Sequence, residues 1–264
     1  MPFVLLLLVC AAALAQEIPP VFGKYCAACH ADSATGTDRG PGLMDTRSLR
    51  SRSEAQIRGI IRDGTRGGMP AFPLADTELD VLARAVRSWN ASAFDARPAG
   101  DAVAGRAFFE GQCLTCHMAR GRGASNGPDL SNIGRELTLR ELEQALLNPN
   151  SRKGKRNGAA CPSWAFCPDD PWGVVRVQMK RGEALRGFAR SRGAHDLQLQ
   201  SFDGKLHLLT EADYSSVVSE PGSYMPALKA TESERRNLTA YLGTLGGVET
   251  GPLPGPAAAV TASE

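Results

Sequence analysis

Two five-residue runs constrain this chain more than any other feature of its sequence. Residues Cys26–His30 read CAACH, and residues Cys113–His117 read CLTCH, so both have the form C-x-x-C-H. On a helical turn, side chains three and four positions apart lie on the same side. Each run therefore brings two thiols and one imidazole together. The runs lie far apart and have different flanks, which predicts two separate sites.

A C-x-x-C pair alone is also typical of redox dithiols and of zinc sites. The histidine in the fifth position instead favours covalent haem attachment, in which the two thiols bond the vinyl groups and the histidine faces the iron. The sequence therefore predicts two haem c groups. The attachment residues are Cys26, Cys29, Cys113 and Cys116.

The first residues of the chain are typical of an export signal. An apolar run from Val4 to Leu14 ends in the small-residue sequence Ala13-Leu14-Ala15. Such a run is too short to span a membrane, and it precedes a cleavage site in secretory signals. We predict that residues 1–15 are a signal peptide, that the protein is periplasmic, and that no transmembrane anchor remains after cleavage.

Two cysteines remain once the C-x-x-C-H runs and Cys10 of the predicted signal are set aside. These are Cys161 and Cys167. An oxidising compartment favours a disulfide between them. Two buried free thiols are the alternative.

Charge is unevenly distributed, although the net side-chain charge is only +2. The stretch from Asn150 to His195 is rich in lysine and arginine, which favours either docking of an acidic partner or an ordinary solvated face. Its basic residues are not interleaved with stacking aromatic residues, so we expect no nucleic-acid partner.

An internal duplication follows the two runs. Gly40-Pro41-Gly42-Leu43 lies after His30, and Gly127-Pro128-Asp129-Leu130 lies after His117. A capping-box pattern then begins an amphipathic segment in each copy, at Ser53 and at Thr138. Both segments are predicted to be short helices.

Each copy continues with a Met-Pro pair and a second amphipathic segment. The pairs begin at Met69 and Met225, and the capping patterns Thr77-x-x-Asp80 and Thr231-x-x-Glu234 predict the final helices. The stretch 94–100 contains proline and glycine without periodicity and is predicted to be a linker. Two similar domains are therefore expected.

This order of motifs resembles the class I c-type cytochromes, and the resemblance extends over most of the mature chain. The composition of the chain end, rich in proline and alanine, predicts a disordered tail at 248–264. The resemblance implies a mainly α fold of two cytochrome c-type helical domains, which we place at residues 17–93 and 101–247. It also implies His30 and Met69 as ligands of the first iron, and His117 and Met225 as ligands of the second. A thioether ligand raises the haem potential.

The second copy departs from this pattern by a long insertion at about residues 148–221. Segments beginning at Val174, Leu197 and Lys205 alternate apolar and polar residues and are separated by glycine turns, which predicts a small β-rich insertion. The insertion resembles that in the haem-binding domain at the end of some large exported bacterial dehydrogenase-like proteins. Those domains share the ending seen here in Ser223-Tyr224-Met225-Pro226.

Other side chains are weaker candidates for iron ligands. His195 and His207 lie in the insertion, and His207 alternates with leucines, which predicts that it faces solvent. Met44 and Met118 lie too close to their C-x-x-C-H runs, and Met179 lies in a predicted strand.

Two irons with both axial positions filled would leave no site for a substrate. We therefore predict an electron carrier without enzymatic activity. Its expected donor is a periplasmic dehydrogenase or quinol-oxidising complex, and its expected acceptor is a terminal oxidase or reductase. Two alternatives remain open: a di-haem peroxidase-like enzyme with one open haem, and a docking subunit of an exported dehydrogenase complex.

Overall fold

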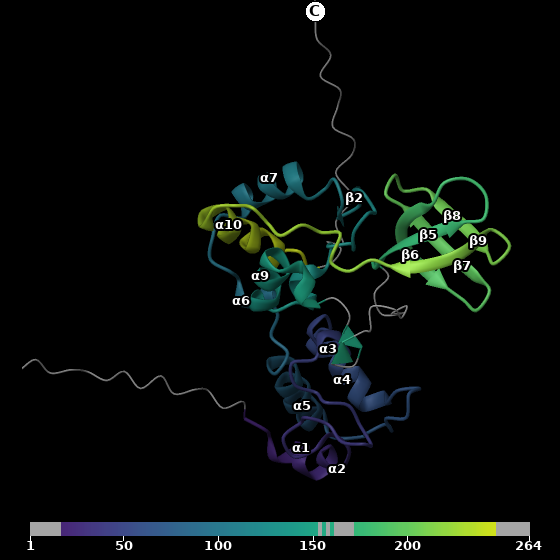
Figure 1. Cartoon of the computed structure of the whole chain (residues 1–264). Helices are drawn as coiled ribbons and strands as arrows, with labels where there is room; N and C mark the ends of the chain where they lie inside the picture. Colours follow the sequence, from purple (N-terminus) through teal and green to yellow (C-terminus); the bar gives the residue numbers. More distant parts are fainter. Residues whose placement is uncertain (1–16, 153–154, 157–158, 161–171, 247–264) are drawn as a thin grey trace, which may run out of the picture. The chain divides into compact units, whose positions relative to one another are not determined.

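The chain divides into two compact units, Met1–Ala91 and Ser92–Glu264 (Figure 1). One C-x-x-C-H run lies in each unit. The computed structural model describes residues 17–152, 155–156, 159–160 and 172–246. The predicted signal peptide 1–15, Cys161, Cys167 and the predicted tail 248–264 lie outside the described residues. The predicted domain boundaries remain predictions.

The first unit is helical over its described residues. Ser53 caps α4 as predicted, because its hydroxyl accepts the backbone N–H of Gln56 while the Gln56 side chain accepts that of Ser53. The predicted start of the last helix at Thr77 is wrong. The helix is capped from Ala75, whose N–H donates to the Glu78 carboxylate at 3.3 Å. The helices are α1 (Pro20–Tyr25), α2 (Ala27–His30), α3 (Arg47–Arg50), α4 (Glu54–Asp63) and α5 (Asp76–Ser88).

Apolar residues at helical spacing on α4 and α5 form the core of this unit. Ile57, Leu79 and Leu82 are each at most 2% exposed. The ring of Phe22 from α1 meets the ring of Trp89 edge to face, with centroids 5.3 Å apart. The core therefore joins the helix before the first C-x-x-C-H run to the last helix of the unit.

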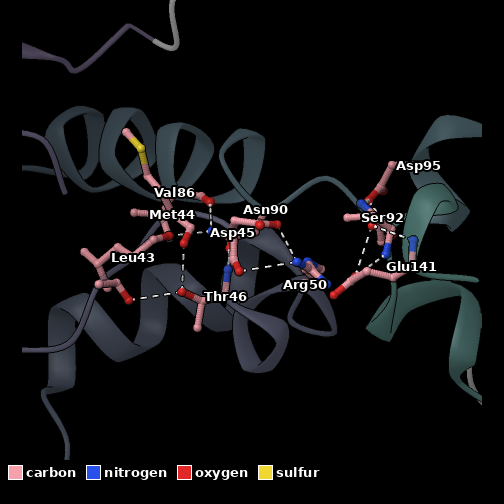
Figure 2. A network of polar contacts seen from close by, with 12 residues as sticks. Leu43, Met44, Asp45, Thr46, Arg50, Val86, Asn90, Ser92, Asp95 and Glu141 are labelled. Atoms are coloured by element: carbon pink, nitrogen blue, oxygen red, sulfur yellow. Dashed lines mark hydrogen bonds and ion pairs between the residues drawn. The ribbon is translucent and has the colours of Figure 1, made fainter. Parts of the chain in front are cut away.

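Asn90 fixes the chain just after α5 (Figure 2). Its side-chain amide donates to the carbonyl oxygens of Leu43 and Val86, both at 2.7 Å, and its Oδ1 accepts the N–H of Thr46 at 2.7 Å. The side chain is 1% exposed, so all three bonds are shielded from water. This asparagine holds the segment after the Gly40–Leu43 repeat against the last helix.

The second unit begins with helices that repeat this plan. Asp101 caps α7 by accepting the N–H groups of Val103 and Ala104. Thr138 and Thr231 form the two predicted capping boxes. The helices are α6 (Ala93–Ala96), which lies partly in the predicted linker, α7 (Ala102–Gln112), α8 (Ile133–Glu136), α9 (Leu139–Leu147), the 3₁₀ turn η1 (Pro149–Arg152) and α10 (Glu232–Gly243).

A close crossing of α7 and α10 organises the core of the second unit. A methyl group added at Gly105 would lie only 1.9 Å from the carbonyl oxygen of Asn237, so the two backbones touch where glycine lacks a side chain. One turn later, the Phe109 ring packs against Tyr241 with centroids 5.3 Å apart. Phe109 and Leu238 are buried in the same cluster.

Five strands form an antiparallel sheet within the insertion, in the order β8-β7-β6-β5-β9. We call these strands the β-module; in Figure 1 they are drawn in green. One face carries the module's own core, and every member of that cluster is at most 8% exposed: Val175, Val177, Ala189, Leu197, Leu199 and Leu209. The strands are β5 (Val174–Met179), β6 (Leu185–Arg192), β7 (Asp196–Ser201), β8 (Leu206–Thr210) and β9 (Tyr214–Ser219). Two-stranded ladders join β1 (Met118–Ala119) to β2 (Arg122–Gly123) and β3 (Lys155–Arg156) to β4 (Ala159–Ala160).

The predicted mainly α fold class is wrong. Helices take up 38% and strands 17% of the structure, with a five-stranded sheet in the second unit. The sequence patterns correctly indicated strands in the insertion, but the prediction treated them as an accessory to a helical domain. The sheet instead buries an apolar cluster of its own, which makes it a substantial part of the unit.

Candidate haem-binding sites

The first C-x-x-C-H run forms a tight helical turn. Cys26 ends α1, and its carbonyl oxygen accepts the N–H groups of Cys29 at 3.1 Å and His30 at 2.9 Å. The two thiols are not joined in a disulfide, and Cys29 is exposed while Cys26 is half-buried. His30 is 8% exposed. The turn thus leaves both sulfur atoms available beside a buried imidazole.

A backbone carbonyl orients the imidazole of His30. Its Nδ1 lies 2.7 Å from the carbonyl oxygen of Pro41. A carbonyl oxygen can only accept, so Nδ1 carries a proton, and in the neutral ring Nε2 then keeps its lone pair for a metal. Gly40 lies against the same ring, because a methyl group there would come within 3.1 Å of Cε1. The Gly-Pro part of the repeat therefore aims the histidine.

The second run has the same local structure. Nδ1 of His117 lies 2.9 Å from the carbonyl oxygen of Pro128, and the side chain of His117 is 9% exposed. A methyl group at Gly127 would lie 2.7 Å from the ring Cε1, so the glycine is again required for the close approach. Cys113 and Cys116 are both half-buried and not joined in a disulfide.

Burial changes the acid–base properties of three of these groups. Burial and, to a smaller extent, the neighbouring Cys29 raise the pKa of the Cys26 thiol to about 11. Burial likewise raises the pKa of Cys113 to about 11, with a smaller contribution from Cys116. It lowers the pKa of His117, against an opposing effect of its bond to Pro128. Burial thus favours the neutral imidazole, which is the form that binds metals.

Met69 lies on a short loop directly after α4. Its carbonyl oxygen accepts the N–H of Thr65 at 2.9 Å, and its own N–H donates to the Thr65 hydroxyl at 3.3 Å. Gly64 makes the turn with a φ of +74°, which favours glycine. The Met69 side chain and Cys26 both pack against the core cluster of the first unit.

Met225 packs against the core of the second unit, but its backbone is held by hydrogen bonds unlike those of Met69. Its N–H donates to the hydroxyl of Ser223 at 3.2 Å, and the Ser223 N–H donates to Oδ1 of Asn150 at 2.5 Å. Met225 and Cys113 both pack against the core cluster of this unit. In each unit, a predicted methionine ligand and an attachment cysteine therefore border one apolar cluster.

Of the weaker candidates for iron ligands, Met44 is the one that packs against the same core cluster as a predicted methionine ligand. Met44 packs against the first core cluster, as Met69 does, and Met179 packs against the core of the β-module. His195 is exposed and lies 3.2 Å from a carboxylate oxygen of Glu211. His207 was predicted to face solvent, but this is wrong: it is partly buried and contacts the Ser201 hydroxyl at 3.0 Å.

The reason is the register of the edge strand β8. Leu199 pairs with His207, which places the histidine on the face of the module core. Leu206 and Leu208 take the other face and are 53% and 72% exposed. No group of three or more His, Cys, Asp or Glu residues suited to a metal occurs among the described residues.

Each unit therefore offers the donor set that a covalently attached haem requires. Two thiols and an imidazole held through Nδ1 lie on one turn, and a thioether borders the same apolar cluster as the first of the two cysteines. The glycine beside the imidazole leaves no room for a side chain. Sequence reasoning recognised the Gly-Pro repeats but not their role in orienting the histidines. Their fixed distance from each C-x-x-C-H run was the available signal.

Comparison with known protein families supports this assignment. Residues 13–84 match the family described as cytochrome C oxidase, cbb3-type, subunit III, and residues 102–163 match the cytochrome c family. The chain contains two cytochrome c-type domains. These domains support a di-haem c-type cytochrome that carries electrons.

A relative was also found among curated proteins. The cbb3-type cytochrome c oxidase subunit FixP of Bradyrhizobium sp. (strain ORS 278) is 31% identical, over 54% of this chain and 52% of that protein. The chain thus spans about half the length of this relative. Among the described residues, no helix is both long and apolar enough to cross a membrane.

Proposed function

We propose that this protein is an exported di-haem c-type cytochrome that carries electrons between periplasmic redox partners, with one histidine and one methionine on each iron. The observation that carries the proposal is the paired arrangement in each unit. In each unit a histidine oriented through Nδ1 directly follows two cysteines that are not joined in a disulfide, and a methionine borders the same apolar cluster as the first of these cysteines. The same arrangement twice favours two closed sites of one kind.

When bound, haem c supplies an iron that alternates between the ferric and ferrous states. The chain's own residues prepare the site for this change. Pro41 and Pro128 hold the imidazoles with Nε2 free, and burial keeps His117 neutral. A methionine thioether stabilises the ferrous state and so raises the potential. The apolar clusters limit the access of water to the site, which affects the redox potential.

The comparisons also favour a class of partner. The matched family and the relative are both named as subunits of cbb3-type oxidases, which supports a terminal oxidase as electron acceptor. We propose a quinol-oxidising complex or a dehydrogenase as donor. An electrostatic docking face on the β-module finds little support, because two of its arginines, Arg176 and Arg186, pair with Glu220.

Carbon monoxide binding tests the closed-site proposal. The haem-loaded protein is reduced with dithionite, exposed to carbon monoxide and followed by absorbance. We expect no binding by the wild type, because carbon monoxide needs a vacant axial position. Met69→Ala and Met225→Ala should each make about half of the haem reactive, since each opens one of two irons.

Matched controls separate ligand loss from damage to the core. Met44→Ala removes a methionine from the first core cluster, and Met179→Ala removes one from the β-module, and neither should open an iron. Binding by about half of the wild-type haem would overturn the proposal of two closed sites. Peroxide turnover with an external electron donor would then test the peroxidase-like alternative.

A further inference from the structure

The face of the β-module opposite its own core is also partly buried. Val174 pairs with Phe188, and Phe188 pairs with Gln200, so these three side chains lie side by side on one face of the sheet. Ala189 follows Phe188 and Leu199 precedes Gln200, and both of these neighbouring side chains point to the module core instead.

Burial shows that this face is covered around these three residues, although Leu206 and Leu208 at its edge are exposed. Val174 is 4% exposed, Phe188 is 1% exposed and Gln200 is 8% exposed. A polar and an aromatic side chain that are both shielded, yet lie outside the module core, must pack against another part of the unit.

Aromatic rings cover one part of this face and lead to Met225. Phe188 meets Trp172, Phe202 and Tyr224 edge to face, with centroids 5.2 to 5.4 Å apart. Phe202 and Tyr224 stack nearly parallel, with centroids 4.2 Å apart and an interplanar angle of 10°. Tyr224 immediately precedes Met225, which packs against the core cluster of the second haem site. This dipeptide therefore joins the β-module to that site.

Hydrogen bonds join the same face to the loop that orients the other ligand. The Gln200 side-chain amide donates to the carbonyl oxygen of Ser125 at 3.1 Å, and the Asn126 side-chain amide donates to the carbonyl oxygen of Phe202 at 2.9 Å. Asn126 directly precedes Gly127-Pro128, whose proline carbonyl holds His117. One sheet face thus contacts both the loop before Gly127-Pro128, which orients His117, and the segment that carries Met225.

We infer that Phe202, Tyr224 and Gln200 are positioning residues for the second haem site: through them the β-module fixes the Met225 loop relative to the turn that orients His117. This inference rests on the proposed function. The first site needs no such device, because Thr65 ties Met69 to the end of α4 within a few residues. In the second unit, the insertion removes that short connection, and its own sheet replaces it.

Phe202→Ala in the full haem-loaded protein tests the inference. The variant removes the ring that stacks on Tyr224 but keeps the backbone carbonyl that Asn126 binds. We expect carbon monoxide, which should not bind the wild type, to bind about half of the reduced haem in this variant, because the ring contacts with Phe188 and Tyr224 are both lost. One of the two midpoint potentials should fall, and the other should stay unchanged.

Phe202→Tyr retains the ring and should show the wild-type potential and, like the wild type, no carbon monoxide binding. Leu208→Ala is the matched control, because Leu208 is exposed on the same sheet and should change neither quantity. Should Phe202→Ala fail to fold, Phe202→Leu keeps apolar volume without stacking, and Asn126→Ala breaks the loop contact without touching the rings. Either is expected to show the same selective change at one haem.

Met225→Ala tests the assignment of Met225 as an iron ligand separately from the positioning role of the β-module. If Met225→Ala opens one iron while the folded Phe202, Asn126 and Gln200 variants leave both potentials and carbon monoxide binding unchanged, the positioning role is overturned and the proposed ligand remains. If Met225→Ala changes nothing, Met225 is not a ligand, and both the ligand assignment and the positioning role are overturned.

Discussion

The two units reach similar donor sets by different routes. In the first, only residues 64–68 separate α4 from Met69, and a single threonine makes both hydrogen bonds to the methionine backbone. In the second, the connection from α9 to Met225 contains a five-stranded sheet with a core of its own. The comparison indicates that the methionine proposed as an iron ligand can be held by local chain geometry or by a folded insertion. In the second case, many more residues influence the site.

The two units also differ in how their terminal helices pack. In the second unit, Gly105 on α7 touches the backbone of α10, and Phe109 follows one turn later. In the first unit, the positions at the same distance from the C-x-x-C-H run are Ile18 and Phe22, and Phe22 contacts Trp89 edge to face. Backbone contact in one unit is therefore replaced by side-chain contact in the other.

Gly105→Ala is expected to have the largest effect on stability. Its methyl group would meet a backbone carbonyl oxygen, which cannot move aside as a flexible side chain can. We expect a loss of about 3 kcal/mol, at the upper end of the usual cost of overpacking, measured by denaturant unfolding of the haem-loaded protein. Gly23→Ala on α1 is the matched control, because it meets nothing within 4 Å. An equal loss in both variants would contradict the packing difference.

Asn90→Ala should destabilise the first unit by about 2 kcal/mol. The variant removes three hydrogen bonds and leaves the backbone groups of Leu43, Val86 and Thr46 short of a partner in a buried setting. In the second unit, a backbone bond from Gly134 N–H to the Leu245 carbonyl oxygen ties the end of α10 to α8. Thermal unfolding followed at each haem should show the loss in one unit. Ser88→Ala, at an exposed neighbour, should change stability by less than about 0.5 kcal/mol.

Gly40→Ala and Gly127→Ala test the feature that the units share. Each methyl group would press on the imidazole that the following proline carbonyl orients. We expect each variant to lose about 1 kcal/mol and to shift the absorbance of one haem. Gly59→Ala, in the open interior of α4, should instead gain up to about 1 kcal/mol. A spectrum unchanged in both site variants would show that these turns do not hold the histidines.

Glu234→Gln should give the smallest effect, and only through its dependence on pH. The backbone N–H and hydroxyl of Thr231 lower the pKa of Glu234 from its ordinary value of 4.5. A lowered carboxyl pKa stabilises the fold above that value, and the contribution disappears as the pH falls through the folded-state pKa. In α4, Gln56 takes the same capping role and does not titrate.

Acid unfolding followed at each haem measures this difference. The glutamine variant should flatten the pH dependence of the second unit below pH 4.5, the ordinary glutamate pKa. The first unit should be unaffected. An unchanged profile in the second unit would remove Glu234 as a contributor.

The sequence by itself determined the local features. One helical turn or one tight loop needs only a short span of chain, so its residues lie close together in the sequence. This holds for the C-x-x-C-H runs, the Gly-Pro repeats and three of the capping boxes. Strand alternation indicated the insertion for the same reason. The predicted start of α5 was wrong, because Glu78 reaches back to Ala75 and competes with the Thr77 pattern.

Only the tertiary structure decided what distant segments do together. No local pattern indicates that Phe202 stacks on Tyr224, that Gln200 reaches Ser125, or that the strands form one sheet with its own core. The orientation of His207 likewise follows from its pairing with Leu199 and not from the leucines beside it. Such contacts depend on register and on which faces are buried, and these are properties of the folded chain as a whole.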